Sequence, residues 1–291
     1  MSEEDFEKEL RQAIDLMSLE RPESRSSLLF LLDLIIEQSS LEERFREALS
    51  DHYQSLRDAA KRVAQERKPL LELVSLPDVP EDLLMESIGS VLRVTRSHRE
   101  DLAEDLARIE AALFGGEGDG NLDPKALVSS ILSGRAEELE EMAGELGVDR
   151  ALIEAVALWS VQPLLRAVSK VVLEDIDLKG WYEGRCPVCG SHTRVGFMRG
   201  EGKKLHLYCT VCGAEWPFQR IKCPFCGNED QERLGFYTVG GDNRFRLYFC
   251  DECGRYWKVV DEEVVGRKIP RVLYDAWTSH LDLAASEKGL K

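Results

Sequence analysis

Apolar positions recur at helical spacing over the first 174 residues of the chain. The first predicted helix, residues 3–20, carries its apolar side chains at intervals of four, four and three: Phe6, Leu10, Ile14 and Met17. No stretch before residue 175 shows the alternation typical of a strand, and the pattern predicts roughly seven to nine helices there. We therefore expect an all-α domain over residues 1–179.

Boundary signals divide this helical region. Ser40, with Glu43 three residues later, matches a capping box and predicts that a new helix begins there. Asp123 followed by Pro124 predicts another helix start. Pro163 lies inside a long predicted helix, residues 150–174, and should kink it or mark its restart.

The pattern changes at Trp181, where β-branched and aromatic residues begin to alternate with polar ones. Three segments are typical of strands: residues 204–209, 244–250 and 255–260. After Pro270 a last helix is predicted over residues 271–285. The predicted organisation is therefore the following: an all-helical domain over 1–179, a first tetracysteine module over 180–219, a second over 220–268, and a C-terminal helix over 269–291.

Charge differs strongly between these parts. The 291 residues carry a net charge of −16, and residues 1–179 alone hold 21 Lys and Arg against 39 Asp and Glu. Residues 180–268 are nearly balanced, with 14 against 12. An acidic body repels a phosphate backbone, so nucleic acid is not an expected partner.

The beginning of the sequence, MSEEDFEKEL, lacks the basic and apolar regions of a secretion signal. The apolar stretch Leu28–Ile36 is far shorter than the roughly 20 residues that cross a bilayer, so we expect a core helix and no membrane span. A cytoplasmic location is the resulting expectation, and paired cysteines in that setting indicate metal or redox chemistry.

All eight cysteines fall in four C-x-x-C pairs, each followed by glycine: Cys186/Cys189, Cys209/Cys212, Cys223/Cys226 and Cys250/Cys253. The pairs form an internal repeat, because the first pair maps on the third with an offset of 37 residues and the second on the fourth with an offset of 41. Trp216 and Trp257 also correspond, and we expect both to pack on their hairpins as small cores.

Two such turns facing each other make a tetrahedral site of four thiolates, which suits zinc or a single iron. Glycine after the second cysteine permits a positive φ there, so that backbone N–H groups can point at the sulfurs. Each module is too small to fold on a core alone, so a metal should stabilise it. We expect two metal ions, iron or zinc, held sequentially by site 1 and site 2: Cys186, Cys189, Cys209 and Cys212; Cys223, Cys226, Cys250 and Cys253.

Other interpretations of the cysteines remain open at this point. A thioredoxin-like redox motif would sit alone at a helix start, and an iron–sulfur cluster would also use four cysteines. In a cross-braced arrangement, the first and third pairs would share one metal. The chain also lacks a phosphate-binding loop, a nucleophile elbow and a metal site with an open position, so it is not expected to be an enzyme.

The sequence resembles the formate dehydrogenase accessory protein (FdhE) family. The resemblance is carried by WYEGRCPVCGS, CTVCGAEW, RIKCPFCGN and CDECGRYWK in that order, and by an LD-x-x-A-x-E-x-G pattern that begins at Leu281. It implies a cytoplasmic factor that contacts the molybdenum- or tungsten-containing catalytic subunit of formate dehydrogenase and is needed for its activity. It also implies two rubredoxin-like modules and no catalysis. The helical region carries no motif to match, so the resemblance does not indicate a partner surface.

The sequence therefore leaves three functions open: a formate dehydrogenase accessory factor, an iron redox protein of rubredoxin type, and a nucleic-acid-binding ribbon protein. The last would use the basic residues of the modules: Lys203, Lys204, Arg244 and Arg246. A homodimer is one option for the assembly.

Overall fold

The computed structural model describes residues 3–76, 78–115 and 122–291. A helical region is followed by a six-stranded sheet region, so the predicted fold class is confirmed. The longer helices are α1 (Glu3–Glu20), α2 (Arg25–Ala48), α3 (Tyr53–Ala60), α6 (Glu81–His98), α7 (Ala103–Phe114), α8 (Pro124–Leu132), α9 (Ala136–Leu146), α10 (Arg150–Val172) and α13 (Ser279–Glu287). The shorter helices are α4 (Val63–Glu66), α5 (Leu70–Leu73), α11 (Glu262–Val265) and α12 (Tyr274–Trp277).

The contacts divide the chain into two compact units that do not follow its order. One comprises the described residues of 1–25, 51–76 and 168–291, and the other those of 26–50 and 77–167. Helical segments from early in the sequence thus belong to the same unit as the cysteine modules. The linear division at residues 179, 219 and 268 stays a prediction.

The helical unit is organised by its apolar faces. α2 buries apolar side chains along its length, including Leu32, Ile35 and Phe45. Its one buried amide, Gln38, donates to Trp159 O (2.7 Å) and accepts from Arg166 Nη1 (3.0 Å). The amide is therefore paired rather than left unsatisfied in the core.

Two boundary predictions in this unit have different outcomes. Asp123 caps α8 as expected, accepting from Lys125 N at 2.8 Å. The helix start predicted at Ser40 is wrong, because α2 continues through it to Ala48. The Ser40 hydroxyl instead donates back to Glu37 O (3.1 Å), and Leu41 continues the buried face.

Among the described residues, one helical segment, Arg150–Asp175, is long and apolar enough to cross a membrane by composition alone. This segment differs from Leu28–Ile36, the apolar stretch considered in the sequence. Two thirds of its most apolar window (67%) is buried inside the protein. A core helix passes the same test, so this segment is weak support for a membrane span.

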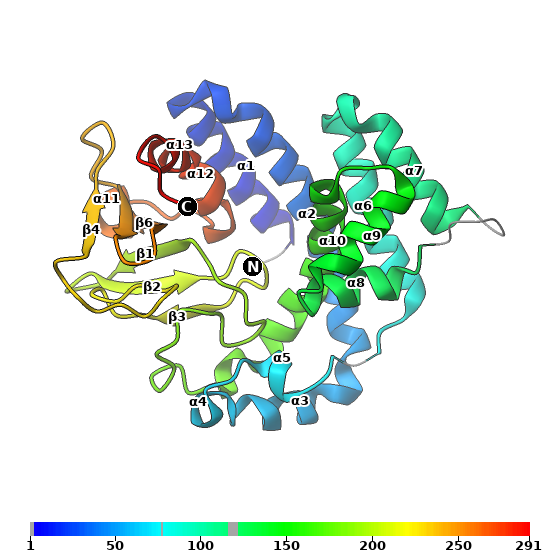
Figure 1. Cartoon of the computed structure of the whole chain (residues 1–291), viewed down its shortest axis with the longest axis horizontal. Coiled ribbons are helices and arrows are strands. Elements are labelled where there is room, and N and C mark those ends of the chain that lie inside the picture. Colours follow the sequence, from blue (N-terminus) through cyan, green and yellow to red (C-terminus); the bar gives the residue numbers. More distant parts are fainter. Residues whose placement is uncertain (1–2, 77, 116–121) are drawn as a thin grey trace. The chain divides into compact units, whose positions relative to one another are not determined.

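The other unit contains the sheet, whose strands have the order β3-β2-β1-β6-β5-β4 (Figure 1). The strands are β1 (Val195–Arg199), β2 (Lys204–Tyr208), β3 (Glu215–Pro217), β4 (Leu234–Tyr237), β5 (Phe245–Cys250) and β6 (Arg255–Asp261). The three predicted strands correspond to β2, β5 and β6. Each module supplies one antiparallel half of the sheet.

A parallel pairing of β1 with β6 joins the two halves. Val195 lies opposite Lys258, and the pairing continues to Met198 opposite Asp261. Lys258 N also donates to Arg194 O at 2.6 Å. The two modules therefore share one continuous sheet instead of folding as separate hairpins.

Helices from both ends of the chain pack within this unit. The predicted C-terminal helix over 271–285 is broken: a 3₁₀ turn, α12 and α13 follow one another, and Thr278 separates the two helices. The Thr278 hydroxyl donates to Tyr274 O at 2.6 Å. α1 lies beside these helices (Figure 1), where Arg21 donates to Trp277 O at 3.2 Å.

Candidate metal centres

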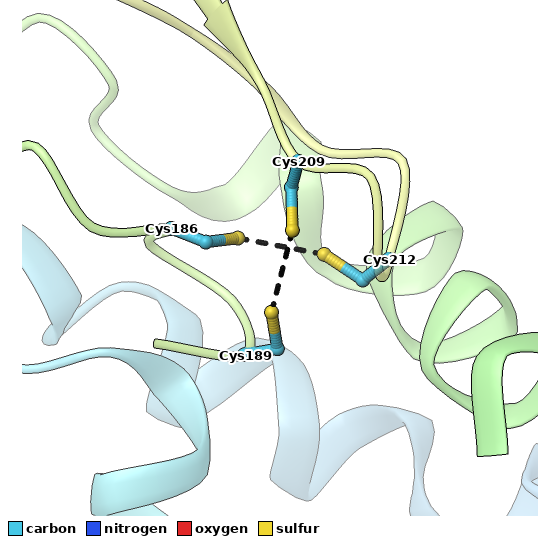
Figure 2. A group of neighbouring side chains, drawn as sticks. All are labelled: Cys186, Cys189, Cys209 and Cys212. Atoms are coloured by element: carbon cyan, nitrogen blue, oxygen red, sulfur yellow. Dashed lines mark hydrogen bonds between the residues drawn. The ribbon is translucent and has the colours of Figure 1, made fainter. Parts of the chain in front are cut away.

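The first cluster brings four sulfurs together at the end of the β2–β3 hairpin. Figure 2 shows the side chains of the four residues pointing toward one centre: Cys186, Cys189, Cys209 and Cys212. All four sulfurs lie within 4.8 Å of one another, and two pairs are closer, Cys186–Cys212 at 3.4 Å and Cys189–Cys209 at 3.5 Å. These separations exceed a disulfide bond of about 2.05 Å.

The second cluster repeats this arrangement at the end of β5. Its four sulfurs also lie within 4.8 Å of one another: Cys223, Cys226, Cys250 and Cys253. Two sulfur pairs are separated by 3.7 Å, Cys223–Cys253 and Cys226–Cys250. The structure thus groups the cysteines in the two sequential sets expected from the repeat and not in cross-braced sets.

The turn that carries each pair has the same geometry in all four cases. The glycine after the second cysteine donates its N–H to the carbonyl of the first, for example Gly190 N to Cys186 O at 3.0 Å. All four glycines have positive φ: Gly190 (79°), Gly213 (73°), Gly227 (75°) and Gly254 (66°). In the first C-x-x-C turn of each cluster, a backbone N–H also points at the sulfur of the first cysteine. Val188 N, for example, lies 3.4 Å from Cys186 Sγ.

The electrostatics of the first cluster disfavour four thiolates in the absence of a cation. Burial raises the pKa of the Cys186 and Cys212 thiols, while hydrogen bonds from the neighbouring thiols lower the pKa of Cys189. Four thiolates cannot share a buried space without a positive charge among them. A divalent ion supplies that charge and would deprotonate the ligands on binding.

The donor set and its dimensions fit a tetrahedral metal ion. A metal at about 2.3 Å from four sulfurs places them about 3.8 Å apart. The closest sulfur pairs in the two clusters, at 3.4–3.7 Å, are near this value. With four protein sulfurs each cluster could hold one ion and leave no position for a substrate. Ligation of a metal by these residues stays a prediction, as does the choice between iron and zinc.

The two clusters differ in their access to solvent. In the first, three sulfur residues are buried and Cys189 is half-buried. In the second, Cys226 is exposed and Cys253 is half-buried. An ion in the second cluster would therefore exchange with solution more readily than one in the first.

A segment from early in the chain supports the first cluster. Leu70 N donates to Pro187 O at 2.9 Å and Leu71 N to Val188 O at 3.2 Å, so the start of α5 binds the backbone of the first turn. Glu72 pairs with Arg185, whose Nη1 lies 2.5 Å away. No local sequence signal predicted this support, because it joins residues more than a hundred positions apart.

The two modules also touch through Gly184, which precedes the first cluster. A Cβ at this position would lie 1.9 Å from Pro224 O, in the first turn of the second cluster. Only glycine permits this approach of two backbones. Apart from the glycine itself, no pattern in the sequence indicates this contact.

The pattern that begins at Leu281 has a structural explanation. Leu281 and Ala285 are fully buried, whereas Asp282 points at the sheet. Asp282 Oδ2 lies 2.7 Å from Nζ of Lys258, which is almost completely buried, and its Oδ1 accepts from Tyr256 OH at 2.7 Å. The pattern thus places the carboxylate of Asp282 beside the ammonium group of Lys258 on β6.

The predicted tryptophan cores are confirmed. Trp216 and Trp257 are both fully buried. Trp181, in the segment that leads into the first cluster, is buried as well and donates to Arg185 O at 3.0 Å. This segment closes over the first module, because Trp216 Nε1 donates to Glu183 O at 3.1 Å.

No family model matches the chain. Among curated proteins, the Protein FdhE homolog of Aquifex aeolicus (strain VF5) is 30% identical over 149 residues, 50% of this chain and 51% of that protein. The homolog of Enterobacter sp. (strain 638) is 30% identical over 173 residues, 56% of this chain and 55% of that protein. Protein FdhE of Escherichia coli O9:H4 (strain HS) is 27% identical over 176 residues, 56% of this chain and 55% of that protein.

The chain therefore spans about half the length of the curated relatives it matches. The crystal structure of the FdhE protein from Pseudomonas aeruginosa resembles it with a TM-score of 0.63 and 17% identity, covering 100% of this chain and 94% of that one. At this identity the likeness shows a common fold. The chain is thus similar in sequence to proteins named FdhE over about half its length, and it shares the fold of a solved FdhE protein over its whole length.

Proposed function

We propose that the chain is an accessory protein of a formate dehydrogenase, binds its catalytic subunit in the cytoplasm and holds two metal ions in closed four-cysteine sites. The observation that carries the proposal is the pair of four-sulfur clusters on a fold shared with an FdhE protein. Sequence similarity to proteins named FdhE supports the same assignment.

A binding role rather than catalysis is supported by the chemistry of the clusters. Each offers four protein sulfurs to one ion, which is the donor set of a structural site. Catalytic zinc sites instead keep one position for water or substrate. The metals would stabilise the two modules and so maintain the surface that meets the partner.

A deletion strain tests the proposed function. Removing the gene should abolish formate oxidation while the catalytic subunit is still synthesised, and a tagged copy of the chain should retain that subunit. Formate oxidation is measured by activity assay, and the catalytic subunit is detected by immunoblotting. Complementation with the wild-type gene is the control. Unchanged formate dehydrogenase activity in the deletion strain would refute the proposal.

A redox role through iron is the second candidate, and the exposure of Cys226 favours it, since electrons reach a solvent-accessible centre more easily. Anaerobic purification should then give a red protein with a reversible one-electron couple. Colourless protein that contains only zinc would rule this candidate out.

Nucleic-acid binding is disfavoured by the pairing of the basic residues that suggested it. Lys203 lies 2.6 Å and Arg246 3.4 Å from the buried carboxylate of Asp261. Arg244 is paired with both Asp242 and Glu20. Three of the four candidate cations are thus paired with carboxylates of the protein, with Lys203 and Arg246 sharing that of Asp261, and no salt-dependent binding to DNA or RNA is expected.

A further inference from the structure

The second module carries an open pocket of about 380 Å³ that the clusters do not use. Its lining includes residues from each of the last three strands, among them Phe236 (β4), Tyr248 (β5) and Trp257 (β6). These three are successive cross-strand partners and therefore occupy the same face of the sheet. The pocket thus lies on this face of the second half-sheet.

The three rings form a continuous aromatic row. Phe236 and Tyr248 have ring centroids 5.3 Å apart, and Tyr248 stacks on Trp257 at 5.4 Å. Phe236 is 50% exposed, and Ile221, which also lines the pocket, is 48% exposed. Both apolar side chains are thus exposed at one pocket, and contiguous apolar patches of this kind, unlike scattered residues, mark interaction sites.

The internal repeat shows what covers the same place in the first module. There the chain's own leading segment passes over the tryptophan, and Glu183 O accepts from Trp216 Nε1 at 3.1 Å. The equivalent Nε1 of Trp257 is buried and has no acceptor among the described residues. A buried donor of this kind costs free energy until it finds an acceptor.

The equivalent of Glu183 in the second module is Arg220, at the repeat offset of 37 residues. Instead of supplying a carbonyl to the tryptophan, Arg220 lines the pocket. Its side chain is exposed and takes part in no ion pair with the described residues. The guanidinium of Arg246 lies over the ring of Phe236 at 5.1 Å but is paired with Asp261 at 3.4 Å, so the positive charge of the pocket lining comes from Arg220. The charge beside the pocket is therefore complementary to an anionic ligand.

We propose that this pocket binds an extended acidic segment of a partner protein. An apolar or aromatic side chain of the segment covers the row beside Trp257, and a carboxylate pairs with Arg220. The identity of the partner rests on the proposed function, whereas the chemistry of the pocket does not.

The chain itself supplies a probe for this site. A capped peptide with the sequence of residues 180–184, GWYEG, carries an aromatic side chain, backbone carbonyls and one carboxylate. It is titrated into the ¹⁵N-labelled, metal-loaded full-length protein, and the five tryptophan indole N–H signals are followed by NMR. The variant Trp257→Phe assigns the Trp257 signal by its loss.

The Trp257 signal should shift progressively, while those of Trp181 and Trp216 stay in place because their N–H groups already have acceptors. Arg220→Glu should weaken binding about fivefold or more, as should a peptide with Glu183→Lys. Arg233→Glu reverses another exposed arginine of the same module, outside the pocket, and should leave binding unchanged. Metal content shows whether each variant is folded.

Absence of a Trp257 shift at millimolar peptide overturns the proposal, as does equal binding by Arg220→Glu and wild type. A Trp257 shift that depends on protein concentration without peptide would overturn it in favour of a second copy of the chain. None of these measurements requires formate dehydrogenase. A failed titration therefore leaves the proposed accessory function standing, and a normal deletion strain leaves the pocket's chemistry standing.

Discussion

Gly184 is constrained by a single close approach rather than by its own conformation. Gly184→Ala would place a methyl group 1.9 Å from Pro224 O, so the backbones of the two modules must separate. We expect the free energy of unfolding to fall by about 2 kcal/mol or more, as for other overpacked sites. Urea denaturation of the metal-loaded protein, followed by circular dichroism, measures the change.

Gly144→Ala is the matched control. This glycine lies in α9, and apart from its chain neighbours and the helix's own nearby backbone nothing lies within 4 Å of the added methyl group, so the substitution should stabilise the protein by up to about 1 kcal/mol. Equal effects of the two substitutions would contradict the role assigned to Gly184.

His280 should make stability depend on pH. Burial, and after it the neighbouring Arg21, lowers the pKa of His280 to about 4 from its usual 6.5. Between these values the unfolded chain binds a proton that the folded one does not, so stability falls as pH decreases from about 6.5 to about 4. The contribution is on the order of 2 kcal/mol, since burial is only partial.

The variant His280→Gln removes this proton while keeping an acceptor for Arg21, whose Nη2 lies 3.1 Å from the ring. Urea denaturation at about pH 5 and about pH 8 should show a smaller loss of stability for the variant than for the wild type. Parallel pH dependences for the two proteins would exclude His280 as the cause.

For individual residues, the sequence predicted what depends on local spacing. The cysteine grouping and the glycine conformations follow from the C-x-x-C-G turns and from the repeat. The role of Gly184 did not follow, because its neighbour Pro224 is forty positions away and no local pattern reports such a contact. The ion pairs of Lys258 with Asp275 and Asp282 could not be predicted for the same reason.

Among the elements, α13 is tied to β6 by a buried charge. Lys258 Nζ contacts Asp282 at 2.7 Å and Asp275 at 2.5 Å. Asp282→Ala leaves the ammonium with one carboxylate and removes the acceptor of Tyr256. We expect a loss of about 3 kcal/mol in the free energy of unfolding, because a buried charge loses a partner.

The double variant Lys258→Met with Asp282→Ala tests this cause. Removing the cation as well should cost less than the sum of the two single substitutions, as a double-mutant cycle in urea would show. Strictly additive losses would mean that the two side chains act independently.

Element boundaries were predictable where the local signal agreed with the tertiary contacts. The cap at Asp123 and the strands β2, β5 and β6 are examples. At Ser40 the capping pattern was present but the buried face of α2 continued across it, so packing outweighed the local signal. The short strands β1, β3 and β4 form mainly through their partners and lack enough alternation to be recognised alone.

For the whole molecule, the two clusters should lose metal independently and at different rates. Cys186→Ser and Cys223→Ser should each lower bound metal by about one ion of two, measured by metal analysis. A chelator should then remove the remaining ion faster from Cys186→Ser, because the cluster left intact there contains the exposed Cys226. Loss of both ions from either single variant would indicate that the clusters depend on each other.

The arrangement of the whole molecule was least accessible from the sequence. Two modules were expected in tandem, but the parallel β1–β6 pairing makes them one sheet, and α5 supports a cluster more than a hundred residues later. Periodicity describes the faces of each element and not which faces meet. The link between β1 and β6 had to come from the structure.

The position of α1 has a consequence for how the chain is made. Arg21, directly after α1, binds Trp277, 256 positions later. At about 5–20 residues per second, a ribosome needs roughly 13–50 s to cover that distance. During this time Leu10, Ile14 and Met17, all buried in the finished protein, lack part of their final surroundings. The helix α1 is thus synthesised early but is among the last to pack in its final place. A chaperone that binds nascent chains therefore has a long time in which to contact it.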